Sequence, residues 1–230
     1  MAAEQRETNP EAILSDRYRL CGVIGRGGMA TVYRAFDSVH ERHVALKQRS
    51  LSGTKGEHGM FEREFHVLSS LSHPSIIEVY DYAVDDSGPY YTMELLDGGD
   101  LREQSPLPWQ RACALLYDVC SSLALIHSRR FVHRDIGPRN IRCTNDGRAK
   151  LIDFGAMVAM GYGELVVGTP AFTAPEVFNL SMLDARTDLF SFGATLYFAL
   201  TGRTAFPVKS FAELEQAWQK PPSAPSRFVP

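Results

Sequence analysis

Residues 133–155 read HRDIGPRNIRCTNDGRAKLIDFG, and this stretch decides the fold of the 230-residue chain. Its middle predicts a β-hairpin, because Asn-Asp-Gly at residues 145–147 separates two short strand-like runs, residues 141–144 and 148–152. Asn and Gly tolerate the positive φ angles that such a tight reversal needs. A hairpin of this length brings the residues that precede it close to the residues that follow it.

Three polar residues flank the predicted hairpin. Asp135 and Asn140 precede it, and Asp153 follows it. The turn would therefore gather two carboxylates and an amide, with no Cys or His among them. Mg²⁺ prefers carboxylate and phosphate oxygens as ligands, so the stretch indicates a magnesium site.

The order H-R-D-x-x-x-x-N followed by D-F-G resembles the eukaryotic-like (Hanks-type) protein kinases. Taken singly, an Asp in a turn or an Asn that caps one explains each position without any catalysis. That explanation does not account for the other family motifs, which follow in the family's order: Lys47, Glu64, Gly168-Thr169-Pro170, Ala174-Pro175-Glu176 and Asp188. The stretches GRGGMATVYRA (25–35) and GTPAFTAPE (168–176) are most similar to the bacterial Ser/Thr kinase group.

The resemblance covers roughly residues 16–225 and implies an α+β, two-lobed protein kinase fold. Residues 1–15 are polar and lack periodicity, so we expect a flexible N-terminal lead. Residues 16–96 form the β-rich N-lobe in this interpretation. Residues 97–230 form the mostly helical C-lobe, which we expect to be truncated before its last helices.

Apolar spacing predicts the main helices. Residues 109–127 carry a wide apolar face, and residues 187–200 are apolar nearly all round, with Gly202 as the expected C-cap. A third helix, which carries Phe61 and Phe65, should end near His73, because a proline follows.

The glycine cluster lies between two strand-like runs. Gly25, Gly27 and Gly28 fit G-x-G-x-x-G-x-V, with Ala30 in the third glycine place. A hairpin turn often carries glycines for conformational reasons alone, and a position between two strands argues against a dinucleotide-binding fingerprint. Residues without side chains also let backbone N–H groups approach phosphate oxygens. The resemblance implies that this loop covers the nucleotide phosphates.

Lys47 closes a V-A-L-K run that resembles the kinase V-A-I-K motif. A lysine at the end of a strand is often only solvated, but this one follows the glycine loop and precedes a helix. The resemblance implies that Lys47 holds the α- and β-phosphates and that Glu64 orients it. Glu62 is the competitor, although it lies off the apolar face of that helix. By the same resemblance, further residues surround the nucleotide: Ile24, Val32, Ala45, Met93 as gatekeeper, and Glu94 to Leu96 as the hinge.

The resemblance assigns Asp135 as the catalytic base and Asn140 and Asp153 as the Mg²⁺ ligands, all in the service of ATP. Two departures from the family pattern stand close by. Gly137 replaces the usual lysine two places after the base, and Arg139, placed as in many tyrosine kinases, could supply the missing charge. Arg142 takes the strand position that usually gives an apolar floor under adenine, where its stem could cover the base while the guanidinium reaches solvent.

The segment after Asp153-Phe154-Gly155 contains one hydroxyl side chain before Gly168, that of Tyr162. We therefore predict that no phosphorylated Ser or Thr controls it. In regulated kinases the arginine of H-R-D, here Arg134, pairs with a loop phosphate. Glu164 is the only acid in the segment and the candidate to replace that phosphate; the alternative is a solvated Glu in a mobile loop.

The motifs together indicate an ATP-dependent protein kinase directed at Ser and Thr hydroxyls of protein substrates. Thr169 supports that preference, because in Ser/Thr kinases a threonine there contacts the catalytic Asp, whereas Arg139 points weakly toward tyrosine. One alternative is a pseudokinase that binds nucleotide or acts as a scaffold, which Gly137 and Arg142 favour. A small-molecule kinase of related fold is disfavoured, because A-P-E and Gly-Thr-Pro belong to peptide-substrate machinery.

Composition limits the partners. The apolar fraction of 44% and charged fraction of 22% are ordinary for a soluble globular protein, and a formal charge of −3 gives no reason to expect nucleic acid or membrane contact. No apolar run is long enough to cross a bilayer, and no signal-peptide core is present, so we expect a cytoplasmic location. Further domains of a longer chain are the other expected partners.

The cysteines show no zinc or disulfide spacing and are expected to be buried, reduced thiols: Cys21, Cys113, Cys120 and Cys143.

Overall fold

The computed structural model describes residues 13–27, 30–49 and 55–229, and these divide into two compact units. The N-terminal unit comprises the described residues up to Ser69 together with Glu78–Leu95. The C-terminal unit comprises Ser70–Ile77 and the described residues from Leu96 onward. Gly28, expected in the glycine loop, lies outside the described residues.

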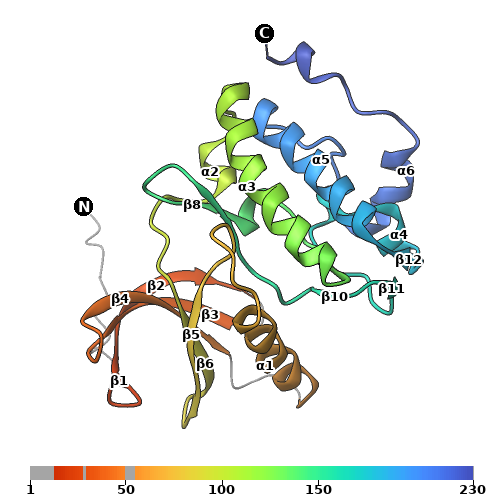
Figure 1. Cartoon of the computed structure of the whole chain (residues 1–230). Coiled ribbons are helices and arrows are strands. Elements are labelled where there is room, and N and C mark those ends of the chain that lie inside the picture. The colour runs from red at the N-terminus through yellow and green to blue at the C-terminus, as the bar shows by residue number, and fades with distance from the viewer. Residues whose placement is uncertain (1–12, 28–29, 50–54, 230) are drawn as a thin grey trace, which may run out of the picture. The chain divides into compact units, whose positions relative to one another are not determined.

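An antiparallel sheet makes up most of the N-terminal unit (Figure 1). Within the described residues it has six strands in the order β1-β2-β3-β4-β6-β5. Alternating apolar side chains of these strands form a buried cluster on one face: Leu14, Tyr18, Ala35, Val44, Leu46 and Tyr90. The strands are β1 (Ile13–Leu14), β2 (Tyr18–Arg26), β3 (Ala30–Asp37), β4 (Arg42–Arg49), β5 (Val79–Asp85) and β6 (Gly88–Met93).

The expected flexible lead has structure at its end. Ile13 and Leu14 form β1 and pair with Arg19 and Tyr18 of β2. Leu14 is 5% exposed, so its burial in the sheet core explains why this short strand forms despite its polar surroundings in the sequence.

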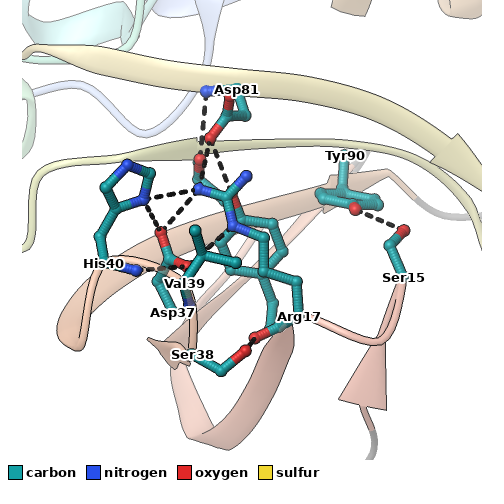
Figure 2. A network of polar contacts seen from close by, with 10 residues as sticks. Ser15, Arg17, Asp37, Ser38, Val39, His40, Asp81 and Tyr90 are labelled. Atoms are coloured by element: carbon teal, nitrogen blue, oxygen red, sulfur yellow. Dashed lines mark hydrogen bonds and ion pairs between the residues drawn. The ribbon is translucent and has the colours of Figure 1, made fainter.

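A polar network fastens the loops that flank β2 and β3 (Figure 2). Arg17 donates two hydrogen bonds of 2.8 Å to the Asp37 carboxylate, which also accepts from the backbone N–H of Val39. The Arg17 guanidinium and these further donors hold the pKa of Asp37 well below its usual range. Tyr18 donates to Asp81 of β5 at 2.8 Å, which joins the same network to the far strand.

Helix α1 (Lys55–Ser69) packs against β5 and β6. It ends at Ser69, so the expectation that it continues to His73 was wrong. The following segment, Ser70–Ile77, belongs to the C-terminal unit because its backbone pairs with Leu151: Leu151 donates to Ser75, and Ile77 donates to Leu151. These hydrogen bonds join segments that are far apart in the sequence, so apolar spacing alone could not show where the helix ends.

Two long helices, α3 (Trp109–Ser128) and α5 (Ala185–Thr201), run side by side in the C-terminal unit (Figure 1). Both confirm the apolar spacing, and Gly202 ends α5 with a left-handed φ of 67° as expected. Shorter elements that sequence periodicity did not resolve lie around them: α2 (Leu101–Gln104), α4 (Pro175–Phe178), α6 (Leu214–Trp218), β7 (Phe131–Val132), β10 (Val158–Ala159), β11 (Gly161–Tyr162) and β12 (Met182–Leu183). Four 3₁₀ turns complete the described part: η1 (Pro138–Asn140), η2 (Pro170–Phe172), η3 (Phe211–Glu213) and η4 (Pro225–Arg227).

The cysteines correct one expectation. Cys143 is buried, but Cys21, Cys113 and Cys120 are exposed, so the expected burial was wrong for three of the four. Across the described residues, no helix has the length and apolar character needed to cross a bilayer.

Candidate functional site

The predicted hairpin forms in the C-terminal unit from β8 (Ile141–Cys143) and β9 (Ala149–Leu151). Gly147 takes a φ of 85° in its turn, as the Asn-Asp-Gly sequence predicts. Beyond the last pair of the ladder, the Ile152 N–H donates to the Asn140 carbonyl at 2.9 Å. Asn140 and Asp153 therefore lie at the adjoining ends of the two strands.

Asp135 receives hydrogen bonds at both carboxylate oxygens. The Asn140 side-chain amide donates to Oδ2 at 2.8 Å and also to the Asp135 backbone carbonyl at 2.8 Å. The Thr169 hydroxyl, from a segment 34 residues later, donates to Oδ1 at 3.0 Å. The side chain of Asp135 is thus fixed in orientation by two neutral donors. Because the side-chain nitrogen of Asn140 already donates both of these hydrogen bonds, the side-chain oxygen Oδ1 is the atom of this residue that would face a cation.

A buried aspartate holds the backbone just before Asp135. Asp188, 0% exposed at the start of α5, accepts from the backbone N–H groups of His133 and Arg134, each at 2.9 Å. It also accepts from Nε2 of His127 at 2.8 Å. An anion with several charge-assisted bonds in a dry interior is a strong anchor, so α5 fixes the direction from which Asp135 enters the site.

His133 occupies the interior beside this anchor. It is 0% exposed, and its ring meets Phe154 edge to face with 4.8 Å between the centroids. Burial lowers the pKa of His133, because the charged imidazolium would lose its hydration. At neutral pH the ring is therefore uncharged in the folded protein.

Two residues of the site take positive φ angles that only glycine adopts readily: Arg134 at 68° and Asp153 at 62°. Such positions cost of order 1–3 kcal/mol each and persist only where the surroundings impose them. At Arg134, the surroundings are the bonds to Asp188 on one side and to the later segment on the other. The strain indicates that the backbone is bent to aim the neighbouring side chains.

The later segment, residues 156–169, is tied to Arg134 through main-chain atoms. The guanidinium donates to the carbonyl of Ala156 at 2.7 Å and to that of Leu165 at 3.3 Å. Glu164, the expected anionic partner, is exposed. Gly168 has a φ of 103°, and a Cβ there would come within 2.8 Å of the Arg134 carbonyl. This close approach requires glycine immediately before Thr169.

Arg142 differs from the expectation that its guanidinium reaches solvent. It donates to the Leu96 carbonyl at 2.8 Å and is half-buried. The same segment touches β8 again at Gly98, where a Cβ would meet the Cys143 carbonyl at 2.2 Å. The expected hinge residue Leu96 and the expected adenine-floor residue Arg142 are therefore neighbours. Arg139, by contrast, is exposed in the middle of η1.

In the N-terminal unit, Lys47 of β4 and Glu64 of α1 form an ion pair. The Lys47 ammonium donates to both carboxylate oxygens of Glu64, at 2.8 and 2.9 Å. The Lys47 side chain is 16% exposed and that of Glu64 is 4% exposed. Glu62 is 55% exposed and lies 3.6 Å from His66, so the apolar-face argument selects the residue that is in fact paired.

The other expected nucleotide residues that the structure describes in the N-terminal unit lie in the same sheet or directly beside its strands. Gly25 of β2, Val32 of β3 and Lys47 are directly opposite one another in neighbouring strands, and Ala45 is opposite Met93. Gly27 donates to Ala30 at 2.9 Å in the loop, and Ile24 is exposed at 49%. Glu94 follows β6 and exchanges hydrogen bonds with Glu78: its backbone N–H donates to the Glu78 carbonyl, and its carboxylate accepts from the Glu78 N–H.

The donor set bears on which metal could bind. Among the described residues there is no cluster of three or more His, Cys, Asp or Glu side chains suited to a metal. Mg²⁺ binds by one or two carboxylates plus substrate phosphates and water rather than by a cage of side chains. The hairpin places Asn140 and Asp153 at adjoining strand ends. The side-chain oxygen of Asn140 and the carboxylate of Asp153 are the kinds of oxygen ligand that Mg²⁺ needs.

Sequence reasoning assigned no role to Tyr91 or His127, and it expected the backbone of residues 94–96 to bind adenine without foreseeing the Arg142 bond to the Leu96 carbonyl. Tyr91 shows only the alternation of a strand, and no local pattern identifies which ring will face a charged pair. Asp188 was recognised by its place in the motif order, but not as the acceptor that holds residues 133 and 134.

Comparisons with known proteins identify related sequences. Residues 18–223 match the protein kinase domain family. A probable serine/threonine-protein kinase of Streptomyces coelicolor is 38% identical over 94% of this chain and 35% of its own length. Serine/threonine-protein kinase PksC of the same organism is 36% identical, covering 94% of this chain and 43% of the relative. Serine/threonine-protein kinase PknL of Mycobacterium tuberculosis is 35% identical, covering 89% and 54%. The chain thus spans about a third to a half of the length of these relatives.

Proposed function

The chain belongs to the protein kinase family and has its α+β, two-lobed fold, and we propose that it transfers the γ-phosphate of ATP to Ser or Thr hydroxyls of protein substrates. The arrangement around Asp135 carries this proposal. It joins the H-R-D aspartate, the asparagine five residues later and the threonine of Gly-Thr-Pro by direct hydrogen bonds. In the kinase family this threonine contact accompanies Ser/Thr substrates, and the relatives reported above carry the names of serine/threonine-protein kinases or probable ones.

Asp135 acts as the base in this proposal. Its Oδ1 and Oδ2 accept from Thr169 and Asn140, which leaves the carboxylate oriented to take the proton of an incoming hydroxyl. Orientation matters here because phosphoryl transfer depends mainly on positioning and charge neutralisation. Thr169 lies on the segment that follows the D-F-G motif, so the hydrogen bond also ties that segment to the base.

Lys47, held by Glu64, binds the α- and β-phosphates, and Asn140 and Asp153 hold Mg²⁺. Mg²⁺, when bound, neutralises charge on the phosphate oxygens and helps to orient them. The nucleotide residues proposed beside these are the glycine-loop and hinge positions described above. Arg139, exposed near Asp135, supplies the positive charge that the family's lysine supplies at the position of Gly137.

A transfer assay with radiolabelled ATP, Mg²⁺ and a generic basic protein substrate tests the function on the full chain. Asp135→Asn, Lys47→Ala and Asp153→Ala should each lower the rate at least a hundredfold, as removal of a group that acts in the transition state does. Exposed residues of matching charge, altered in Asp86→Asn and Lys209→Ala, are the controls and should transfer at the wild-type rate.

Phosphoamino-acid analysis of the product then identifies the acceptor, with phosphoserine or phosphothreonine expected. Wild-type turnover by any of the three site variants would remove that residue from the proposal. Nucleotide binding without transfer by the wild-type protein would favour the pseudokinase alternative instead.

A further inference from the structure

A row of residues crosses the sheet of the N-terminal unit at Lys47. Val32 of β3 lies directly opposite Lys47 of β4, and Lys47 lies directly opposite Tyr91 of β6. Residues directly opposite one another in an antiparallel ladder project from the same face. Successive residues project from opposite faces, so Tyr90 belongs to the other side, where it is part of the buried cluster around Leu46.

The Tyr91 ring lies close to the Lys47 ammonium. The nitrogen is 5.7 Å from the ring centroid, and Tyr91 is 1% exposed. A cation within about 6 Å of an aromatic face is attracted by the ring quadrupole, and more strongly where water is excluded. An apolar side chain at this position would give the ammonium no such attraction.

The same ring contacts the helix that carries the anionic partner of Lys47. Its centroid lies 5.1 Å from that of Phe61 and 5.8 Å from that of Phe65, which precede and follow Glu64 on α1. Glu64 is buried and accepts hydrogen bonds from Lys47. Tyr91 thus touches the cation directly and the anion through its helix.

We propose that Tyr91 is a positioning residue that sets the Lys47–Glu64 pair in the geometry needed to receive nucleotide phosphates. The proposal rests on the function proposed above for Lys47. Partly buried charges pay a desolvation cost that only good geometry repays, and the Tyr91 ring restricts both partners of the pair. Neighbouring tyrosines do less: Tyr82 contacts Phe61 and Phe65, and no contact of its ring with Lys47 is observed.

Kinetics on the full chain separate this role from a contribution to folding. Tyr91→Leu should raise the KM for ATP about threefold to thirtyfold, the factor that corresponds to a lost cation–π contact. Tyr91→Phe keeps the ring and should stay within about twofold of wild type. A variant that merely unfolds in part lowers the rate per total protein and leaves the KM for ATP unchanged.

Two matched controls come from the same sheet. Tyr90→Leu removes an equally buried ring from the opposite face, and Tyr82→Leu removes a ring that packs on α1. Both should keep the wild-type KM for ATP, whatever they do to the melting temperature. If Tyr91→Leu does not fold, Tyr91→Met, which fills more of the space without an aromatic face, takes its place and should show the same rise.

Chemical labelling tests the placement of Lys47 without ATP or a protein substrate. The rate at which an amine-reactive acetylating reagent modifies Lys47 is followed by peptide mass spectrometry, with the exposed Lys209 and Lys220 as internal references. Labelling of Lys47 should be faster in Tyr91→Leu (or Tyr91→Met) than in wild type, Tyr91→Phe, Tyr90→Leu or Tyr82→Leu. Equal labelling rates in wild type and Tyr91→Leu would overturn the proposal. A wild-type chain that transfers no phosphate would overturn the proposed function, and the labelling result would still decide on Tyr91.

Discussion

Gly137 and Arg139 show how a single position changes the chemistry available beside Asp135. Gly137 is extended at φ −163°, and a Cβ there would meet Phe172 at 3.7 Å, an ordinary contact distance. Glycine is therefore not required by the backbone, and a Cβ atom fits there. The positive charge that this position lacks is found two residues later, on the exposed Arg139.

We expect Arg139→Ala to lower the transfer rate by on the order of a hundredfold, because a cation that stabilises the transferring phosphoryl group is worth a few kcal/mol. The double change Gly137→Lys with Arg139→Ala should recover part of that loss, since the backbone accepts a side chain at 137. Steady-state transfer rates of both variants measure this. A silent Arg139→Ala would show that the charge comes from elsewhere.

At the residue scale, sequence reasoning succeeded where the spacing of nearby residues determines which way a side chain points. The choice of Glu64 over Glu62 followed from the apolar stripe of the helix, and the structure pairs Glu64 with Lys47. It failed where the partner is set by tertiary packing. Nothing near Arg142 in the sequence indicates that its guanidinium will bind the Leu96 carbonyl, 46 residues away.

At the element scale, length and periodicity decide what can be predicted. Helices α3 and α5 have enough turns to show an apolar face, and their ends lie within two residues of expectation. The strands β7, β10, β11 and β12 have two residues each, too few for any alternation. Their pairing depends on backbone hydrogen bonds between distant segments, as in Val158 with Val132.

The segment from Ala156 to Thr169 is the element whose ordering can be tested directly. Arg134 holds it through two backbone carbonyls, and Thr169 holds its end through Asp135. Neither attachment needs a phosphate or a side-chain anion. We therefore expect phosphatase treatment to leave the transfer rate unchanged, and Glu164→Ala to stay within about twofold of wild type, as exposed substitutions usually do.

Transfer rates before and after phosphatase treatment, with intact mass to verify dephosphorylation, provide the measurement. Tyr162→Phe removes the only hydroxyl between Gly155 and Gly168 and serves as the companion variant. An enzyme inactivated by phosphatase would place a controlling phosphate on the segment. A large loss in Glu164→Ala would restore that carboxylate as the partner of Arg134.

At the scale of the whole molecule, each unit has a core of its own, and the motifs are shared between them. The N-terminal unit carries Lys47 and Glu64 in its sheet and helix, and the C-terminal unit carries Asp135, Asn140 and Asp153 on one hairpin and its approach. The motif order in the sequence predicted this fold correctly, and the family match over residues 18–223 agrees with it. The assignment of Ser70–Ile77 to the C-terminal unit could not be predicted, because contacts with segments distant in the sequence hold it there, among them hydrogen bonds with Leu151 and from the Ser122 hydroxyl.

The neutral His133 links the site to the stability of the folded chain. Burial lowers its pKa in the folded state, whereas in the unfolded state the value is about 6.5. As the pH falls below about 6.5, the unfolded chain binds a proton that the folded chain does not, so the free energy of unfolding decreases. Urea unfolding should therefore show a lower free energy of unfolding at pH 5.5 than at pH 7.5, with a slope from this residue of at most about 1.4 kcal/mol per pH unit. His133→Phe keeps a ring against Phe154 but cannot titrate, and comparison with it cancels the other histidines. It gives up the Asp135 N–H contact to Nδ1, 3.3 Å long, a cost that does not vary over this pH range. The slope of stability against pH, rather than its level, is thus the quantity to compare. A wild-type slope no steeper than that of His133→Phe would mean that His133 is protonated as readily in the folded chain as in the unfolded one.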